Sequence, residues 1–544
     1  MKKSLIVRLV IGLIYGLFGY AVANNQLNIA NSYWVTKIAY VASFLIVGYS
    51  VIVYAFDSLI HLEIFADSFL ILGASIGVIL LGNFVEALIV LFLFVLGEGL
   101  RDLSIAILTE RVKKVKVSKK SNDERANILL EEMPEYTEFG KTMNIDLEEK
   151  TLAEKSAKKV MLTFTIIFCF LAVFIAFIPP IIFNENHREW IYRALMFVAA
   201  ATSATAIASV PITLLIGRGS CFKNGILVKK ADNIYNLAKT KIAVLDKTAT
   251  ITTGLYEINK IVPKDISEEE LIRIVAHGEK NSQHVLAIPL RNVYRGKYDE
   301  TKVKDCEEIP GKGIKANIFL DDVLIGNEKL LREYNIRFKE PVDKGTIVHV
   351  AVSGEYKGYF VLSDMLREDA KDGIEVMAKE RIKDFYLISG DNRDTVVETA
   401  GRIGISDCYS ELLPGEKEGV LEGILSKRKG KQKLLFVGMG ENNKACLEKA
   451  DIGAIISDTN DNNKYLEYAD CVITEGKVSG LGKAINISKK TIGNIKESIY
   501  CAIIIKIAIL TVAGLGYAKM WMIPLADLVV SLLLIFDSMK LLKK

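Results

Sequence analysis

Apolar residues form long runs before residue 217 and after residue 493, and only short runs between these points. A helix that crosses a bilayer needs ~20 mainly apolar residues. The runs that approach this length cover residues 4–23, 34–55, 65–83, 85–107, 160–184, 190–216, 497–517 and 519–541. The pattern therefore predicts a membrane protein with about eight spanning helices.

The first run, MKKSLIVRLVIGLIYGLFGYAVANN, also resembles a secretory signal peptide. Arg8 interrupts the run early, its apolar part is long for a signal, and further spans follow it. These features favour a first membrane helix over a cleaved signal.

The middle of the chain has a different pattern. Short apolar runs such as KIAVLD, FYLIS and ADIGAII alternate with charged helical segments, which is typical of a parallel sheet wrapped by helices. We expect a doubly wound α/β domain at 217–255 and 356–493, interrupted by a smaller α+β insert at 256–355. Membrane helices then occupy 1–107, 160–216 and 494–544, and a short loop of uncertain fold occupies 108–159.

Charge and composition refine this picture. The MKK start, the loop ERVKKVKVSKK at 110–120, the segment after residue 216 and the KLLKK end are all basic. The positive-inside rule places both ends and the α/β head in the cytoplasm, and we expect the membrane to be the plasma membrane. The net charge is only +4 and no basic–aromatic cluster occurs, so a nucleic-acid partner is not expected. The seven scattered cysteines form no CxxC pair and indicate neither a disulfide framework nor a zinc site.

The first candidate for chemistry is Asp246, at the end of the buried strand KIAVLD. Open parallel sheets bind ligands at the carboxyl ends of their strands, where an aspartate can attack a phosphoryl group and form an aspartyl phosphate. Alternatively, a strand-end aspartate only caps a turn.

The motifs around Asp246 resemble those of P-type ATPases. DKTATIT is similar to the family's DKTGTLT, with Ala249 in place of glycine. LISGDNRDTVVETAGRIGI, LLPGEKEGV, SDMLREDA and GMGENN follow in family order. The resemblance implies an HAD-like phosphorylation domain. Its catalytic residues would be Asp246, Lys247, Thr248, Asp391 and Lys417.

The insert resembles the nucleotide-binding domain of the heavy-metal subgroup. EKNSQHVLA is similar to ExxSxHPLA, with valine in place of the proline, and PGKGI and GNEKLL match two further pieces of that pocket. The resemblance implies that ATP is bound by Glu279, Ser282, His284, Gly311 and Gly313. His284 would stack on adenine, although a plain surface or core histidine is the alternative.

The membrane part resembles the zinc, cadmium and lead exporters of that family. Lys506 and Asp527 look like the charged pair typical of these pumps and are candidates for a remnant of the ion site. The alternative is an internal ion pair, formed because each charge would otherwise be buried alone. Glu98 either faces a hydrated entry or lies at the interface.

One departure from the family concerns the magnesium ion that accompanies ATP. Family members have GDGxND, whose aspartates help to bind Mg²⁺, whereas this chain has Met439 and Asn443 at these positions. Mg²⁺ prefers carboxylate and water oxygens, and without it the charge on a transferring phosphoryl group is poorly neutralised. We therefore expect phosphorylation of Asp246 to be severely weakened.

Other departures affect the actuator and the ion path. The loop at 108–159 is short and lacks the TGE motif of an actuator domain. The metal-binding CPC becomes Thr202-Ser203-Ala204, while the later Pro211 is retained. The lost proline removes an expected helix break, and the Thr202 and Ser203 hydroxyls would then bond within the helix. The chain also begins without a CxxC metal-binding domain, which some pumps lack.

These observations lead to one main hypothesis and two alternatives. The main hypothesis is a non-pumping relative in the lipid membrane that binds nucleotide and acts by association, for example on an active transporter. The first alternative is a working ATP-driven heavy-metal exporter with altered motifs. The second is a phosphatase-like enzyme that uses Asp246 without transport.

Overall fold

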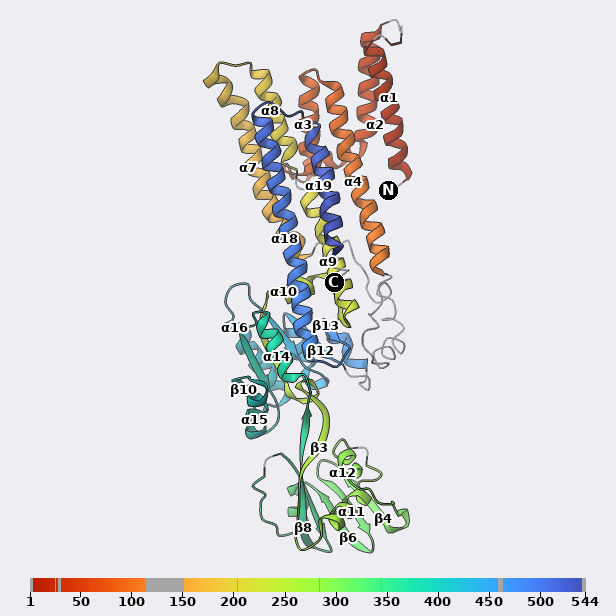
Figure 1. Ribbon diagram of the computed structural model, residues 1–544, viewed down its shortest axis with the longest axis vertical. Coiled ribbons are helices and arrows are strands. Elements are labelled where there is room, and N and C mark those ends of the chain that lie inside the picture. The colour runs from red at the N-terminus through yellow and green to blue at the C-terminus, as the bar shows by residue number, and fades with distance from the viewer. Residues whose placement is uncertain are drawn as a thin grey trace. The chain divides into compact units, whose positions relative to one another are not determined.

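The computed structural model describes residues 3–24, 26–27, 31–113, 151–202, 204–282, 284–343, 345–457 and 463–540 (Figure 1). The chain divides into two compact units. The first unit, the membrane unit, comprises Met1–Ala238 and Asn486–Lys544, and the second, the head, comprises Lys239–Ile485.

The membrane unit consists mainly of helices of different lengths. They are α1 (Lys3–Ala23), α2 (Ser32–Ile60), α3 (Asp67–Leu80), α4 (Phe84–Lys113), α7 (Leu152–Phe183), α8 (His187–Ala200), α9 (Ala204–Lys223), most of α18 (Ser479–Gly514) and α19 (Met522–Ser538). Within the described residues, α1, α2, α7 and α18 are long and apolar enough to cross a membrane. The number of eight spans stays a prediction.

The span expected at 190–216 is two helices, because α8 ends at Ala200 and α9 begins at Ala204. The expectation that this helix is unbroken without a proline is wrong. The break exposes backbone carbonyl groups that need other donors. The Thr165 hydroxyl of α7 donates to the Ala201 carbonyl at 2.7 Å, and Lys506 Nζ of α18 donates to the Ala200 carbonyl at 3.0 Å. Side chains from two other helices thus stabilise the break.

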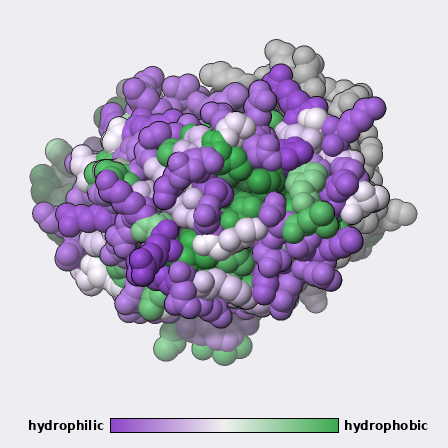
Figure 2. Space-filling view, turned by 90° about the horizontal axis from the view of Figure 1, so that it is seen from below, coloured by the Kyte–Doolittle hydropathy of each residue, from purple (hydrophilic) through white to green (hydrophobic). Residues whose placement is uncertain are grey.

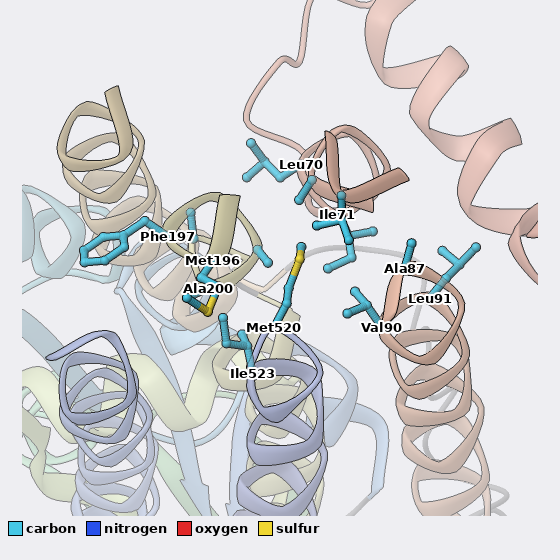
Figure 3. Close-up of a cluster of buried hydrophobic side chains, with 14 of the residues drawn as sticks. Leu70, Ile71, Ala87, Val90, Leu91, Met196, Phe197, Ala200, Met520 and Ile523 are labelled. Atoms are coloured by element: carbon cyan, nitrogen blue, oxygen red, sulfur yellow. The ribbon is translucent and has the colours of Figure 1, made fainter. Parts of the chain in front are cut away.

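Small residues let these helices approach closely. A Cβ atom added to Gly12 of α1 would lie 2.2 Å from Val47 Cγ2 of α2, and one added to Gly48 would lie 2.6 Å from Leu91 Cδ2 of α4. Such contacts are typical of helix packing in membranes. A buried apolar cluster joins α3, α4, α8 and the start of α19, and Figure 3 shows side chains from each of them, including Leu70, Val90 and Met196.

The head contains a parallel sheet with the strand order β13-β12-β11-β2-β9-β10. Its strands are β2 (Thr240–Asp246), β9 (Asp384–Ile388), β10 (Asp407–Tyr409), β11 (Lys433–Val437), β12 (Ile452–Ile456) and β13 (Cys471–Ile473). Helices α14 (Ala370–Lys379), α15 (Arg393–Ile403), α16 (Pro414–Lys427) and α17 (Lys444–Lys449) connect the strands. The central strands are almost fully buried, as expected for a sheet covered on both faces. The predicted doubly wound fold is confirmed.

An antiparallel sheet forms the insert, with the order β3-β8-β7-β6-β5-β4. Its strands are β3 (Thr252–Pro263), β4 (Val303–Ile309), β5 (Gly313–Ile318), β6 (Asp321–Gly326), β7 (Thr346–Val352) and β8 (Glu355–Leu366), and its helices are α11 (Glu268–Gly278), α12 (Ala287–Asn292) and α13 (Glu328–Glu333). Figure 2 shows, from below, the end of the insert at which β4, β6 and β8 are labelled in Figure 1. Hydrophilic residues cover most of this face. Because β3 and β8 pair from Thr252 to Pro263, this sheet starts before residue 256 and ends after residue 355.

Candidate active site and nucleotide pocket

Asp246 lies at the carboxyl end of β2, between the neighbouring strands β9 and β11. The chain passes from β2 to β9 and β10 on one side and then returns to β11 and β12 on the other. The strand order therefore reverses at β2, which is where open α/β sheets place their ligand sites. The side chain is only 3% exposed. The structure thus places Asp246 where the sequence predicts it, as a buried carboxylate at the end of a strand.

Two nitrogen donors hold the two oxygens of this carboxylate. Lys417 Nζ, on α16, lies 2.7 Å from Oδ1, and Asn443 Nδ2 donates to Oδ2 at 2.9 Å. Asn443 Nδ2 also lies 2.7 Å from the Met439 carbonyl oxygen, which fixes the amide orientation. Burial raises the pKa of Asp246, while Lys417 and Asn443 oppose that rise by stabilising the charged form.

Lys247 points to a different carboxylate. Its Nζ lies 2.5 Å from Asp391 Oδ2, and the lysine side chain is almost fully buried. The Asp391 amide in turn donates to Ser389 Oγ at 3.1 Å. The charge on Asp391 is close enough to add to the rise in the pKa of Asp246. The structure thus brings together Asp246, Lys247, Asp391 and Lys417, whereas Thr248 is exposed.

The turn after Asp246 is held from the insert side. Ala249 adopts φ +53°, in the left-handed region that favours glycine. Thr252 Oγ1 donates to Asp364 Oδ2 at 2.6 Å, and the Gly254 amide donates to Asp364 Oδ1 at 3.1 Å. Asp364 was not singled out by the sequence, although it lies in SDMLREDA. Its signal is only that motif, because the contact joins residues more than 100 positions apart.

The residues here do not fit a magnesium ion. Positions 439 and 443 supply a thioether and an amide whose nitrogen faces Asp246. Magnesium needs oxygen ligands in near-octahedral geometry, and both oxygens of Asp246 already accept N–H groups. Across the ranges that the structure describes, no group of three His, Cys, Asp or Glu side chains is arranged to hold a metal.

The first motif that is expected to bind nucleotide follows α11. Glu279 and Ser282 are buried and hydrogen-bonded to each other, and burial raises the pKa of Glu279 to about 7. Arg291 Nη1 donates to three carbonyl oxygens of this turn, including that of Ser282 at 2.8 Å. His284 is exposed and its Nδ1 accepts from the Leu286 amide at 3.3 Å. The turn is thus pre-ordered, with the imidazole at the surface.

The second motif is the turn between β4 and β5. Gly311 has φ +71° with open space where a Cβ would be, and Gly313 has φ +141° with a Cβ position 2.2 Å from the Ile325 carbonyl oxygen. A Cβ on Gly278, next to Glu279, would also contact Ile325. The two motifs therefore lie against the same residue of β6, at one end of the insert sheet.

The candidate ion pair lies in the membrane unit. Lys506 Nζ is 2.9 Å from Asp527 Oδ2, and the Thr202 hydroxyl donates to the same oxygen at 3.3 Å. The Thr202 hydroxyl also lies 3.2 Å from the Ala199 carbonyl oxygen, so its one proton is shared between an acceptor at the end of α8 and Asp527 on α19. Glu98 and Asp527 line one small cavity of about 40 Å³.

Some predictions fall outside the described residues. They are the Ser203 hydroxyl and most of the loop at 108–159, of which residues 114–150 are not described.

Comparisons with known proteins agree with the motifs. The family of haloacid dehalogenase-like hydrolases matches residues 240–439. The chain is 31% identical over 415 residues to the cadmium, zinc and cobalt-transporting ATPase of Bacillus subtilis (strain 168), covering 75% of the chain and 59% of that relative. It is 31% identical over 406 residues to the zinc-transporting ATPase of Synechocystis sp. (strain ATCC 27184 / PCC 6803 / Kazusa), covering 73% of the chain and 56% of the relative. The matched region thus spans less than two thirds of these relatives.

A solved structure shares the fold. The crystal structure of a zinc-transporting PIB-type ATPase in the E2.Pi state aligns with a TM-score of 0.68 at 20% identity, over 99% of this chain and 100% of that one. The class is therefore a helical membrane protein with an HAD-like α/β head. Within that class, the chain belongs to the heavy-metal P-type ATPase family, among relatives named as cadmium and zinc transporters.

Proposed function

We propose that this protein is a membrane-embedded P-type ATPase relative that binds nucleotide but neither transfers its phosphate nor pumps metal. One observation carries the proposal. Lys417 and Asn443 occupy the two oxygens of the strand-end nucleophile, so Asp246 is part of a buried ion pair and not of a metal site.

Phosphoryl transfer depends on positioning and on neutralising the charge of the phosphate. A resident lysine ammonium supplies one positive charge to Asp246, but it cannot bridge the nucleophile and a phosphate as a metal ion does. The Met439 and Asn443 side chains supply no carboxylate. Attack by Asp246 would first have to break its bonds to Lys417 and Asn443 inside a buried site, which adds to the barrier.

Nucleotide binding has separate support. Side-chain hydrogen bonds hold the backbone of both turns in the insert. Arg291 donates to the Ser282 carbonyl in the first turn, and Asn327 donates to the Gly311 carbonyl in the second. Adenine recognition by shape and apolar contact needs no metal, because the metal acts on the phosphates. We expect Glu279, Ser282, His284, Gly311 and Gly313 to contact the base and ribose.

The membrane unit supports the same assignment. The Lys506 ammonium forms an ion pair with Asp527. The segment Thr202-Ser203-Ala204 has none of the thiolates that soft metals prefer. We place the protein in the plasma membrane with its head and both ends in the cytoplasm. There it acts by association with another membrane protein, such as a transporter.

The test is equilibrium ATP binding by the full chain in nanodiscs, measured by calorimetry with and without Mg²⁺. The proposal predicts that adding Mg²⁺ changes the affinity for ATP by less than about twofold, which is a small change in binding free energy. His284→Ala should weaken binding, while Leu320→Ala, at an exposed turn of the same sheet, should not. Binding that requires Mg²⁺ would contradict the proposal.

A second candidate is an ATP-driven exporter of zinc-like cations. The contacts of Lys506, Thr202 and Asp527 at the helix break favour it, because a broken helix and a charged pair are suited to an ion path. ATP turnover together with zinc or cadmium uptake into vesicles, lost in Asp527→Asn, would establish this alternative.

A further inference from the structure

Two adjoining cavities lie in the membrane unit and have opposite character. One, of about 1020 Å³, is lined by the α3–α4 turn, the start of α4, helix α8 and the α18–α19 turn. The other, of about 330 Å³, lies between α1, α2 and α4. Tyr40, Val85 and Ile89 line both. The two cavities therefore adjoin at these residues, of which Val85 and Ile89 lie on the same face of α4.

The smaller cavity is apolar and is kept open by a glycine. Its lining comes mainly from leucine, valine and aromatic side chains. A Cβ on Gly16 would meet Ser43 Oγ at 3.4 Å and Leu88 Cδ1 at 4.0 Å, which are ordinary contacts. At Gly12 the same atom would lie 2.2 Å from Val47 Cγ2. Helix packing thus requires glycine at position 12 but not at position 16, where its effect is to leave space.

The larger cavity is charged. Arg188, Arg193 and Lys519 contribute three positive groups, against the two carboxylates of Glu86 and Glu189. The side chains that line this cavity therefore carry a net positive charge.

Both arginines are fixed in place. Arg188 donates to the Leu81 carbonyl at the end of α3, and Arg193 donates to the Gly514 carbonyl at the end of α18 at 3.2 Å. A guanidinium has five donors, so these bonds leave others for a ligand. Glu86 Oε1 accepts from the Tyr192 hydroxyl and from the Met520 amide at 2.8 Å, so part of its acceptor capacity is used internally.

We propose that these two cavities bind one anionic membrane phospholipid. An acyl chain fills the apolar cavity beside Gly16, and the phosphate lies in the charged cavity near Arg193 and Lys519. The apolar cavity alone would accept a chain from any lipid. The surplus of positive charge selects an anionic headgroup, because basic pockets between membrane helices attract such lipids.

The test uses the full chain in nanodiscs containing equal parts of phosphatidylglycerol and phosphatidylcholine. Native mass spectrometry after mild release counts the lipids that stay bound. The unmodified protein should retain phosphatidylglycerol in preference. Lys519→Gln should lower that preference about fivefold, as expected for the loss of one basic group. Lys329→Gln, at an exposed position of α13 in the insert, is the matched control and should change nothing.

Filling the apolar cavity tests the other half of the site. Gly16→Leu should remove the retained lipid, while Gly73→Leu, at a glycine whose added Cβ meets nothing within 4 Å, should leave it in place. Equal retention of the two lipids by the unmodified protein would overturn the proposal. So would a Gly16→Leu protein that keeps as much phosphatidylglycerol as Gly73→Leu. Because Lys519 is exposed, its variant gives a reading even if Gly16→Leu fails to fold.

Discussion

Each unit of the protein contains an ion pair between a lysine ammonium and an aspartate carboxylate, and the surroundings of the two pairs differ. In the head, Lys417 and Asn443 engage both oxygens of Asp246, whose side chain is 3% exposed. In the membrane unit, Lys506 and Thr202 both engage one oxygen of Asp527, whose side chain is 20% exposed and lines a cavity.

On the proposed function, this difference separates a head site that has become structural from a membrane site that an ion can still reach. The Asp246 carboxylate accepts a hydrogen bond at each oxygen and is buried, which leaves a metal ion little access to it. A carboxylate that shares one oxygen and borders a cavity can still be reached by an ion or water. On the proposed function, the head site is therefore the more fully altered of the two.

The largest effect is expected from breaking the head pair. Lys417→Ala leaves the Asp246 carboxylate buried without its cation, which should destabilise the head by about 3–5 kcal/mol. Thermal unfolding of the full chain measures the loss. Lys449→Ala, which breaks exposed pairs with Glu418 and Glu422, is the control and should cost less than about 1 kcal/mol. Adding Asp246→Asn to Lys417→Ala should restore much of the stability, and no recovery would contradict a buried pair.

Breaking the membrane pair should cost less. Lys506→Met leaves Asp527 partly hydrated and deprives the Ala200 carbonyl of its donor, a loss of about 1–3 kcal/mol. Unfolding in one detergent, compared with Lys417→Ala under the same conditions, measures the order of the two effects. A larger loss for Lys506→Met than for Lys417→Ala would reverse the comparison.

Glu279 provides a third buried carboxyl group, whose side-chain donor is the Ser282 hydroxyl. Its folded-state pKa of about 7 lies above the ordinary value of 4.5. The folded protein therefore binds more protons than the unfolded chain between these values, and the contribution to stability is complete below pH 4.5 and is lost as the pH rises through 7. The slope is at most about 1.4 kcal/mol per pH unit. Melting temperatures from pH 4.5 to 8 should show this slope in the unmodified protein and not in Glu279→Gln.

The smallest effect concerns the turn that follows Asp246. Ala249 has φ +53°, a conformation that costs a residue with a Cβ about 1 kcal/mol relative to glycine. Ala249→Gly should therefore raise stability by up to about 1 kcal/mol without restoring phosphorylation. Thermal unfolding checks the first outcome. A destabilised variant would show that the methyl group makes a contact that outweighs the strain.

Much of the head follows from local sequence. KIAVLD is apolar and ends in an aspartate, so both the buried strand and the position of Asp246 at its end can be predicted. The replacement of aspartate by asparagine at position 443 predicts a weak magnesium site. The hydrogen bond from Asn443 to Asp246 cannot be predicted, because it depends on the orientation of an amide 197 residues away.

The membrane unit shows where such prediction ends. The break after Ala200 carries no proline or glycine, and its carbonyl groups are satisfied by Thr165 and Lys506, which lie 36 and 306 residues from their acceptors. The length of a hydrophobic run does not show whether its helix is continuous, so the single run at 190–216 does not predict two helices. Long-range donors of this kind leave no mark in the local pattern.

The most direct test of the central claim is labelling of the full chain with γ-³²P-ATP in the presence of Mg²⁺, followed by acid quenching. The account predicts that the unmodified protein retains no more label than Asp246→Asn, since Lys417 and Asn443 hold the carboxylate. Acid-stable label on the unmodified protein that disappears in Asp246→Asn would show that the site transfers phosphate, and would contradict the account.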